Sequence, residues 1–297
     1  MNTIFNNTNV LITGGGGYLG SKLAEKIVNY NATISLIDVR FNRLSEQLNK
    51  TKSNLTLYEC DINNSEQLTQ ICKNISPDII YHFAALLERS RDFSLYKKLY
   101  KVNVEGTYNL LEALLTCNYT KFMFSSSSEV YGTLNKTPFT ENQIPLPASP
   151  YSLTKLLAEE VIRTYSTIKY KPYTIMRLFN FYADDMPENF FYSQLVNTLS
   201  RNEEFKMTSG EQIRDFLPVE QVLDYIIKLT ERDNNNYEIV NICSGTGVKL
   251  KEFALKTAKT IEKEHLLKIG SIEYRDNEVW VMVGNNNLLS GIIRNND

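Results

Sequence analysis

The sequence has few of the residues that indicate a disulfide scaffold, a metal centre or a membrane protein. Its four cysteines and two histidines are scattered singly, so neither disulfide pairs nor a set of metal ligands is predicted. No apolar run reaches the roughly 18 residues of a membrane-spanning helix, and the first residues lack the charged and apolar regions of a signal peptide. We therefore expect a cytoplasmic protein with buried, reduced thiols.

An excess of positive charge is also missing. The 32 lysines and arginines are balanced by 34 aspartates and glutamates, which gives a net charge of −2 and no broad basic field. Nucleic acid and membranes are therefore not expected as partners. A chain of 297 residues is long enough for one large domain with a full core and a smaller lobe.

Along the first two thirds of the chain, strand-like runs alternate with helical ones. The expected strands lie near residues 9–13, 33–37, 54–58, 78–83, 120–125 and 173–178. The expected helices lie near residues 18–30, 64–74, 94–117 and 151–168. This alternation predicts an α/β fold with a doubly wound parallel sheet that has helices on both faces. The proline-rich residues 132–149 are expected to form a loop at the carboxyl edge of that sheet, where loops line the site.

The first strand and helix carry a pattern typical of dinucleotide binding. The apolar run 9–13 breaks into four glycines, residues 14–17, and Gly20 follows in the helix. These glycines fit both G-x-G-x-x-G and G-x-x-G-x-x-G, and either pattern allows the backbone to approach a pyrophosphate at the start of a helix. Asp38 closes the next strand, where its carboxylate can bind both hydroxyls of an adenosine ribose. The unit predicts a nicotinamide or flavin cofactor.

The same aspartate bears on the choice between two nicotinamide cofactors. Its carboxylate would repel the 2′-phosphate of NADP, so NAD is expected to bind better. Arg40, two residues later, could instead hold that phosphate.

A second informative stretch is the strand 121–124, which runs into four serines, residues 125–128, and Glu129. Hydroxyls just past the carboxyl end of a strand can bond a substrate alcohol or carbonyl. About 20 residues later, Ser149 suits a helix N-cap and Pro150 the first helical position.

Tyr151 and Lys155 then share one face of that helix. A phenol is a poor base at neutral pH unless a cation favours its phenolate, and Lys155 and an oxidised nicotinamide would supply positive charge. Tyr151 could then remove a proton from an alcohol as hydride leaves its carbon. Two other pairs have the same spacing, Tyr18 with Lys22 and Tyr165 with Lys169, and their positions favour surface or core roles.

Together these motifs resemble the extended short-chain dehydrogenases/reductases, namely the NAD-dependent epimerase/dehydratase family that acts on nucleotide-diphosphate sugars. The resemblance covers nearly the whole chain. It implies that the catalytic residues are Ser127, Tyr151 and Lys155, with Glu129 as a further candidate. It also implies a set of cofactor-binding residues: Gly14, Gly17, Tyr18, Leu19, Gly20, Asp38, Asp61, Ile62, Phe83, Ala84, Ala85, Asn103, Ser125, Tyr151 and Lys155.

The last third of the chain carries the part of the resemblance that concerns the substrate. Asn180, Arg214 and Arg275 fall where the family binds the sugar diphosphate, and the planar fork of arginine suits phosphate oxygens. The resemblance implies a dinucleotide-binding domain of residues 1–179, to which 213–243 returns. The smaller nucleotide-sugar lobe is then expected to comprise residues 180–212 and 244–297.

Two departures from the family pattern concern the reaction. The family usually continues after Asn180 with Tyr-Gly-Pro, whereas this chain has Asp184 and Asp185 there and no Gly-Pro. The sugar dehydratases carry Asp-Glu directly after the catalytic hydroxyl, whereas Ser128 and Glu129 follow here, so 4,6-dehydration is not expected. The Ser-Glu pair resembles that of nucleotide-sugar decarboxylases, although Glu129 could equally cap a helix or bond the backbone.

The expected function is that of an NAD-dependent nucleotide-diphosphate-sugar 4-epimerase or 4-dehydrogenase, with hydride transfer at C4 and Tyr151 as acid and base. A 4-ketoreductase, a decarboxylase and a non-catalytic NAD(P)-binding protein remain alternatives. Residues 190–192 could stack a nucleotide base or pack the lobe. The family also implies a homodimer or larger oligomer through the helices near 94–117 and 151–168, which carry more apolar residues than one buried face requires.

Overall fold

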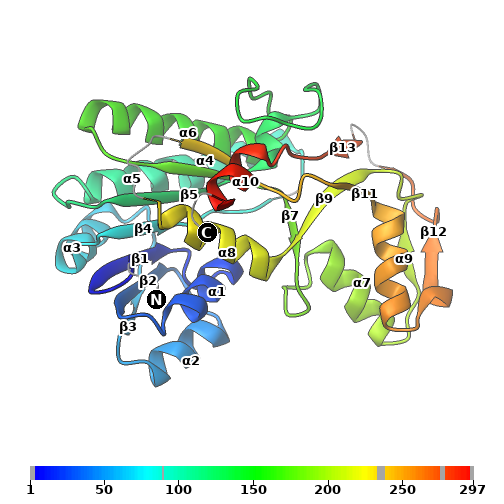
Figure 1. Ribbon diagram of the computed structural model, residues 1–297, viewed down its shortest axis with the longest axis horizontal. Coiled ribbons are helices and arrows are strands. Elements are labelled where there is room, and N and C mark those ends of the chain that lie inside the picture. Colours follow the sequence, from blue (N-terminus) through cyan, green and yellow to red (C-terminus); the bar gives the residue numbers. More distant parts are fainter. Residues whose placement is uncertain (1–3, 89, 233–237, 275–277, 295–297) are drawn as a thin grey trace.

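The computed structural model describes residues 4–88, 90–232, 238–274 and 278–294 (Figure 1). In these residues, seven strands form one sheet in the order β10-β6-β5-β4-β1-β2-β3, and every neighbouring pair is parallel. The strands are β1 (Thr8–Thr13), β2 (Ala32–Asp38), β3 (Leu55–Glu59), β4 (Ile79–His82), β5 (Lys121–Ser127), β6 (Thr174–Leu178) and β10 (Glu238–Ile242). Strand order reverses between β1 and β4, which is the switch point at which doubly wound sheets bind ligands.

Helices cover both faces of this sheet. One face packs against α1 (Tyr18–Ile27), α2 (Arg43–Thr51), α8 (Val219–Thr230) and α10 (Asn287–Arg294). The other face packs against α3 (Ser65–Ile75), α5 (Gly106–Ala113) and α6 (Pro150–Lys169). Strand β1 shows why both faces need to be covered. Val10 and Ile12 pack into one core and Leu11 packs into the other, because successive strand residues point to opposite faces.

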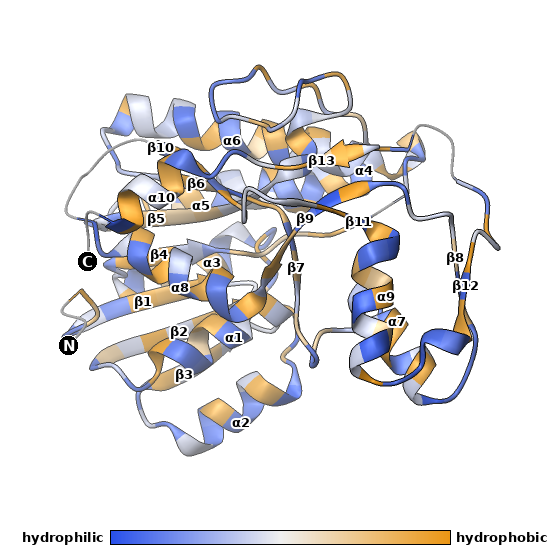
Figure 2. Cartoon of the chain, turned by 45° about the vertical axis from the view of Figure 1, so that its right-hand side comes forward, coloured by the Kyte–Doolittle hydropathy of each residue, from blue (hydrophilic) through white to orange (hydrophobic). Residues whose placement is uncertain are grey.

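A smaller lobe lies beyond the carboxyl edge of the large sheet (Figure 1). Its central strand, β9 (Ile213–Pro218), pairs with β7 (Asn180–Tyr182), β11 (Gly247–Lys249) and β13 (Val281–Met282). A two-stranded sheet, β8 (Phe205–Met207) with β12 (Leu267–Ile269), lies beside α7 (Phe191–Ser200) and α9 (Leu250–Thr260). Figure 2 shows β1 and β2 mainly in the colours of hydrophobic residues, whereas α7 and α9 each combine hydrophobic and hydrophilic residues.

The predicted α/β fold with its doubly wound parallel sheet is confirmed, and the six predicted strands differ from the observed ones by one or two residues at their ends. The helix expected near 94–117 is continuous over 96–113 and so ends four residues early, and it consists of α4 (Tyr96–Tyr100), a π-helical turn (Lys101–Glu105) and α5. Helix α2 was not predicted. Residues 132–149 contain no helix or named strand, as expected for a loop.

The division into domains stays a prediction. Strand β9 pairs with the strands of the lobe, while α10 adds Leu289 and Ile292 to a core of the large sheet. Among the residues with described structure, no helix combines the length and apolar character that crossing a membrane requires.

A buried ion pair fixes α6 against the large sheet. Arg177 of β6 and Glu159 of α6 are 2 % and 0 % exposed, and their closest atoms, Nη2 and Oε2, are 2.7 Å apart. A second bond joins Arg177 Nε to Glu159 Oε1 at 3.1 Å, and Ser126 of β5 also donates to that oxygen. The pair therefore joins α6 to both β5 and β6.

We expect Glu159→Gln to lower the free energy of unfolding by about 3–5 kcal/mol, because it leaves the buried Arg177 charge without its counter-ion. Urea denaturation followed by circular dichroism measures the loss. Glu160→Gln is the matched control, since Glu160 pairs with Arg163 on the exposed side of the same helix and the two side chains are 51 % and 48 % exposed. Equal denaturation midpoints for the two variants would contradict the expectation.

Candidate active site

A cavity of about 490 Å³ opens between the carboxyl ends of β5 and β6 and the lobe. This volume lies in the range of small-molecule sites. Nine of the residues singled out from the sequence line it together: Phe83, Ala85, Ser125, Ser127, Glu129, Tyr151, Lys155, Asn180 and Arg214. Residues separated by as many as 131 positions in the chain are thus brought to one cavity by the fold.

The serines at the end of β5 have different partners. Ser125 Oγ donates to the carbonyl oxygen of His82 at 3.3 Å, and Ser128 Oγ lies 3.1 Å from Met282 Sδ. Ser127 has extended backbone geometry, and its Oγ accepts the N–H of Glu129 at 3.2 Å. Because accepting this bond leaves the hydroxyl proton of Ser127 available, this serine can donate to an oxygen of a ligand in the cavity.

Helix α6 begins as the sequence predicts. Ser149 is its N-cap and accepts the N–H of Ser152 at 3.1 Å, while the Ser152 hydroxyl bonds back to the Ser149 N–H at 3.0 Å. Pro150 occupies the first turn. This cap fixes where the helix starts, and it thereby places Tyr151 and Lys155 in the cavity wall.

Lys155 is almost fully buried, with its Nζ 4.2 Å from the centre of the Phe124 ring. Burial lowers the pKa of Lys155 to about 7, against the opposite effect of the Glu159 carboxylate one turn further along α6. The ring face favours the charged form as well. Lys155 can therefore gain or lose its charge near neutral pH beside Tyr151.

A chain of buried polar groups supports this region. His82 lies between Thr13 and Thr107, at 2.7 Å and 2.8 Å. Burial, and next the positive charge of Lys155, lower the pKa of His82 to about 3, so it is neutral. Asn103 donates to Leu86 O and to Thr154 Oγ1, and so ties the loop after β4 to α6.

The glycine unit lies at the switch point of the sheet. Gly14 has φ of +73°, and a Cβ there would lie 2.6 Å from the backbone nitrogen of Ala84. A Cβ on Gly20 would lie 2.2 Å from the carbonyl oxygen of Gly14. Helix α1 starts after Gly17 with neither a side-chain cap nor an acidic residue in its first turn, which leaves its N–H groups for an anion. The geometry suits a dinucleotide pyrophosphate.

Asp38 closes β2 beside these glycines. Its Oδ2 accepts the N–H of Gly16 at 3.0 Å, and its Oδ1 accepts the N–H of Val39 at 2.8 Å. The carboxylate is thus held at the carboxyl edge next to the glycine turn. Asp61 is exposed and bonded to the N–H of Asn63, and Ile62 is buried. Tyr18 and Leu19 begin α1 and are partly buried.

The lobe contributes Asn180 and Arg214. Asn180 Nδ2 donates to the carbonyl oxygen of Asp215 at 3.4 Å, and Arg214 Nη2 lies 2.8 Å from Glu278 Oε1. Arg275 lies outside the described residues. The sequence analysis missed Glu278, Gln212 and Arg91, which also line the cavity. For Glu278 the reason is that no local pattern marks a residue whose partner is 64 positions away.

Glu129 lines the cavity directly after the serines. Its Oε2 accepts the hydroxyl of Ser149, the cap of α6, at 3.5 Å. The carboxylate therefore faces the cavity and contacts the helix that carries Tyr151.

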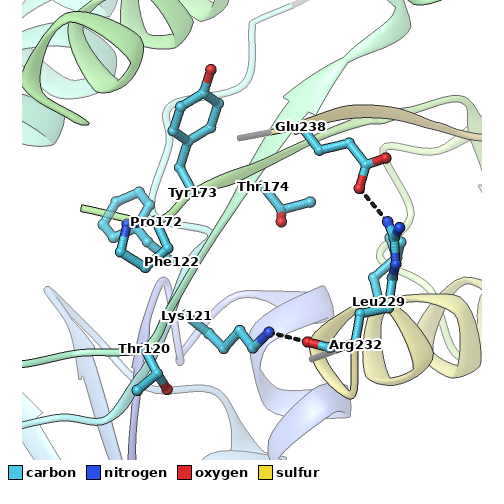
Figure 3. A pocket seen from close by; sticks show the side chains of 9 residues that line it. All are labelled: Thr120, Lys121, Phe122, Pro172, Tyr173, Thr174, Leu229, Arg232 and Glu238. Atoms are coloured by element: carbon cyan, nitrogen blue, oxygen red, sulfur yellow. Dashed lines mark hydrogen bonds and ion pairs between the residues drawn. The ribbon is translucent and has the colours of Figure 1, made fainter. Parts of the chain in front are cut away.

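A second hollow lies at the opposite, amino edge of the sheet (Figure 3). Its volume is about 10 Å³, which is room for about one water molecule. Within it, Arg232 pairs with Glu238, and Lys121 Nζ donates to the carbonyl oxygen of Arg232. These charged groups already have partners within the protein, so this hollow is not a candidate site. No group of three metal-ligating side chains occurs within the described ranges.

Known proteins that are similar to this chain include curated relatives and solved structures. Curated relatives include a UDP-glucose 4-epimerase of Bacillus subtilis, 28% identical over 281 residues that cover 86% of this chain and 83% of that protein. A UDP-glucose 4-epimerase of Rhizobium meliloti is 27% identical over 299 residues, with 94% and 89% covered. These enzymes are similar along almost their whole length.

Among solved structures, the UDP-glucose 4-epimerase of Thermotoga maritima with UDP-glucose has a TM-score of 0.85 at 25% identity, and covers 95% of this chain and 91% of its own. MoeE5 in complex with UDP-glucuronic acid and NAD has a TM-score of 0.85 at 25% identity, with 96% and 92% covered. The family model described as GDP-mannose 4,6 dehydratase matches residues 11–285. The chain therefore belongs to the family that this model represents, the NAD-dependent epimerase/dehydratase branch of the extended short-chain dehydrogenases/reductases.

Proposed function

We propose that this protein is an NAD-dependent 4-epimerase or 4-dehydrogenase of a nucleotide-diphosphate sugar. The observation that carries the proposal is that Ser127, Tyr151 and Lys155 line one cavity together with Asn180 and Arg214 of the lobe. The relatives named UDP-glucose 4-epimerase support a UDP-sugar as the substrate.

The cofactor assignment rests on the glycine unit and on the neighbour that binds NAD with a UDP-sugar. Gly14, Gly17 and Gly20 permit the close backbone approach, the free N–H groups of α1 suit the pyrophosphate, and Asp38 suits the adenosine ribose. NAD, when bound, supplies a group that can accept a hydride from the sugar C4 and return it.

The chain's own residues handle the proton and hold the substrate. Tyr151 takes the proton of the C4 hydroxyl, and Ser127 donates a hydrogen bond to the same oxygen. Lys155 in its charged form favours the phenolate of Tyr151. Arg214 binds the diphosphate, and its present partner Glu278 keeps its guanidinium in the cavity wall.

The proposal includes a homodimer. Tyr108 on α5 and Leu115 just after it are exposed, at 52 % and 39 %, on the helix expected to pack against its copy. Exposed apolar side chains of this size suit a contact between two copies.

A nucleotide-sugar decarboxylase is the second candidate. The observation that favours it is the carboxylate of Glu129, which lines the same cavity. A 4-ketoreductase would use the same Ser127, Tyr151 and Lys155, so only its product distinguishes it. A non-catalytic NAD(P)-binding protein has no evident need for these three residues.

Tyr151→Phe is expected to reduce turnover by about 100- to 10,000-fold while it preserves NAD affinity and the thermal unfolding midpoint, because the ring still packs but cannot exchange a proton. The assay follows a UDP-glucose substrate by chromatography and the reduced nicotinamide by its absorbance. Tyr165→Phe is the control. Tyr165 also precedes a lysine by four positions, but its side chain lies in the hydrophobic core between α6 and the large sheet. Wild-type turnover by Tyr151→Phe would contradict the mechanism.

Glu129→Gln separates the two candidate reactions. An enzyme that works only at C4 is expected to keep its turnover within about threefold, because the variant keeps the shape and hydrogen bonds of the side chain. A decarboxylase that uses the carboxylate is expected to oxidise the sugar and then stall, with reduced nicotinamide accumulating. Mass spectrometry of the products decides between these outcomes.

NAD is expected to bind about tenfold or more tightly than NADP, because the Asp38 carboxylate repels the 2′-phosphate at short range. Titration by protein fluorescence measures both affinities. Asp38→Asn is expected to reduce the difference by removing the negative charge, whereas Arg40→Ala leaves the preference for NAD in place. Tighter binding of NADP by the wild-type protein would refute the assignment.

A further inference from the structure

The Tyr18 and Lys22 pair, which the catalytic site does not use, contacts a carboxylate of the lobe. Tyr18 Oη donates to Asp185 Oδ1 at 2.6 Å, and Lys22 Nζ lies 2.6 Å from Asp185 Oδ2. Both residues stand in the first turns of α1, directly after the glycines. The two oxygens of one carboxylate thus join segments 167 positions apart in the chain.

Asp185 belongs to the segment that leads from β7 to α7, which passes between the helices of the large sheet and the lobe (Figure 1). This segment replaces the usual Gly-Pro turn of the family and brings two adjacent carboxylates. Asp184 accepts the hydroxyl of Tyr192 at 2.6 Å, so the first carboxylate holds the lobe while the second holds α1.

Ring contacts make the same segment compact. The ring centres of Phe181 and Phe190 are 6.1 Å apart, and those of Tyr182 and Tyr192 are 5.2 Å apart. Phe181, Phe190 and Tyr192 also line the cavity. These contacts join the two ends of the segment to each other. A bond at Asp185 therefore restrains the aromatic residues of the cavity wall as well as the loop.

Tyr18 and Lys22 on α1 are well placed to hold the Asp185 carboxylate. The ring of Tyr18 packs against a core of the large sheet, so its hydroxyl is held in place. Burial, and next the bond to Asp185, raise the pKa of Tyr18, which therefore stays a donor. Burial acts to raise the pKa of Asp185, but the bonds from Lys22 and Tyr18 outweigh it and the pKa lies below its usual value. The carboxylate is therefore charged at neutral pH.

We propose that Asp185 is a positioning residue whose bonds to Tyr18 and Lys22 clasp the segment 183–190 against the start of α1 and slow the release of the bound dinucleotide. The identity of that ligand rests on the proposed function. Tyr18 and Lys22 follow directly after the glycines, so the clasped segment contacts the helix turns whose N–H groups are proposed to hold the pyrophosphate, and we expect it to obstruct release of the ligand. Asp184 supports the clasp through Tyr192.

The test measures how fast the holoprotein releases NADH. Protein loaded with NADH is mixed with excess NAD, and the fall in nicotinamide fluorescence gives the release rate without any turnover. Asp185→Ala is expected to speed release by about 5- to 10-fold, which matches the net loss of a hydrogen bond at a partly exposed carboxylate. Glu25→Ala is the matched control: Glu25 is the other carboxylate that pairs with Lys22, at 3.2 Å, but it lies on α1 itself and does not reach the lobe.

A double-variant cycle tests whether the two ends act together. Tyr18→Phe is also expected to speed release, and Tyr18→Phe with Asp185→Ala is expected to release NADH within about twofold of Asp185→Ala alone, because both changes remove the same bond. Multiplying effects, or an unchanged rate in Asp185→Ala at an unchanged unfolding midpoint, would overturn the clasp and leave the proposed function intact. A wild-type protein that takes up no NADH would instead overturn the proposed function, and the clasp with it.

Discussion

The buried carboxylate of Glu159 makes the contacts on which the position of α6 in the cavity wall depends. It lies two turns beyond Tyr151 and one turn beyond Lys155 on α6, and it bonds Arg177 of β6 and Ser126 of β5. A charge buried in this way tolerates little displacement, because its partner would be left unpaired. The ion pair therefore sets how α6 is placed relative to β5, and with it how Tyr151 faces the serines.

The same carboxylate balances the electrostatics of the site. Full burial favours the neutral amine of Lys155, whereas the proposed support of a phenolate needs the ammonium. Burial, opposed by the charge of Glu159, brings the pKa of Lys155 to about 7, so Lys155 can hold a proton and release it, and the face of the Phe124 ring also favours the charged form. The Glu159 carboxylate thus holds α6 in place and also partly offsets the effect of burial, which favours the neutral form of Lys155.

The sequence predicted what is local and missed what joins distant segments. Strand ends, the Ser149 cap and the glycine turn are encoded by neighbouring residues, so their positions followed from pattern and spacing. The pairs Glu159 with Arg177, Arg214 with Glu278, and Tyr18 with Asp185 were not predicted, because periodicity tells which face of an element is buried and not which residue meets it. The π-helical turn at 101–105 leaves the apolar pattern continuous, which explains why one long helix was expected.

Membership of the family does not by itself name the reaction. In the proposed reaction, oxidation at C4 needs NAD as the hydride acceptor and, from the protein, a base, a hydroxyl and a cation, which are the roles proposed for Tyr151, Ser127 and Lys155 whatever follows. The later steps depend on which charged groups stand near the rest of the sugar. One such group in this cavity is Glu129, a carboxylate one position further from the serine than the aspartate of the sugar dehydratases. Its contact with Ser149 places it between the cap of α6 and the cavity, and the two proposed reactions differ in whether this carboxylate acts on the sugar or only supports the cap.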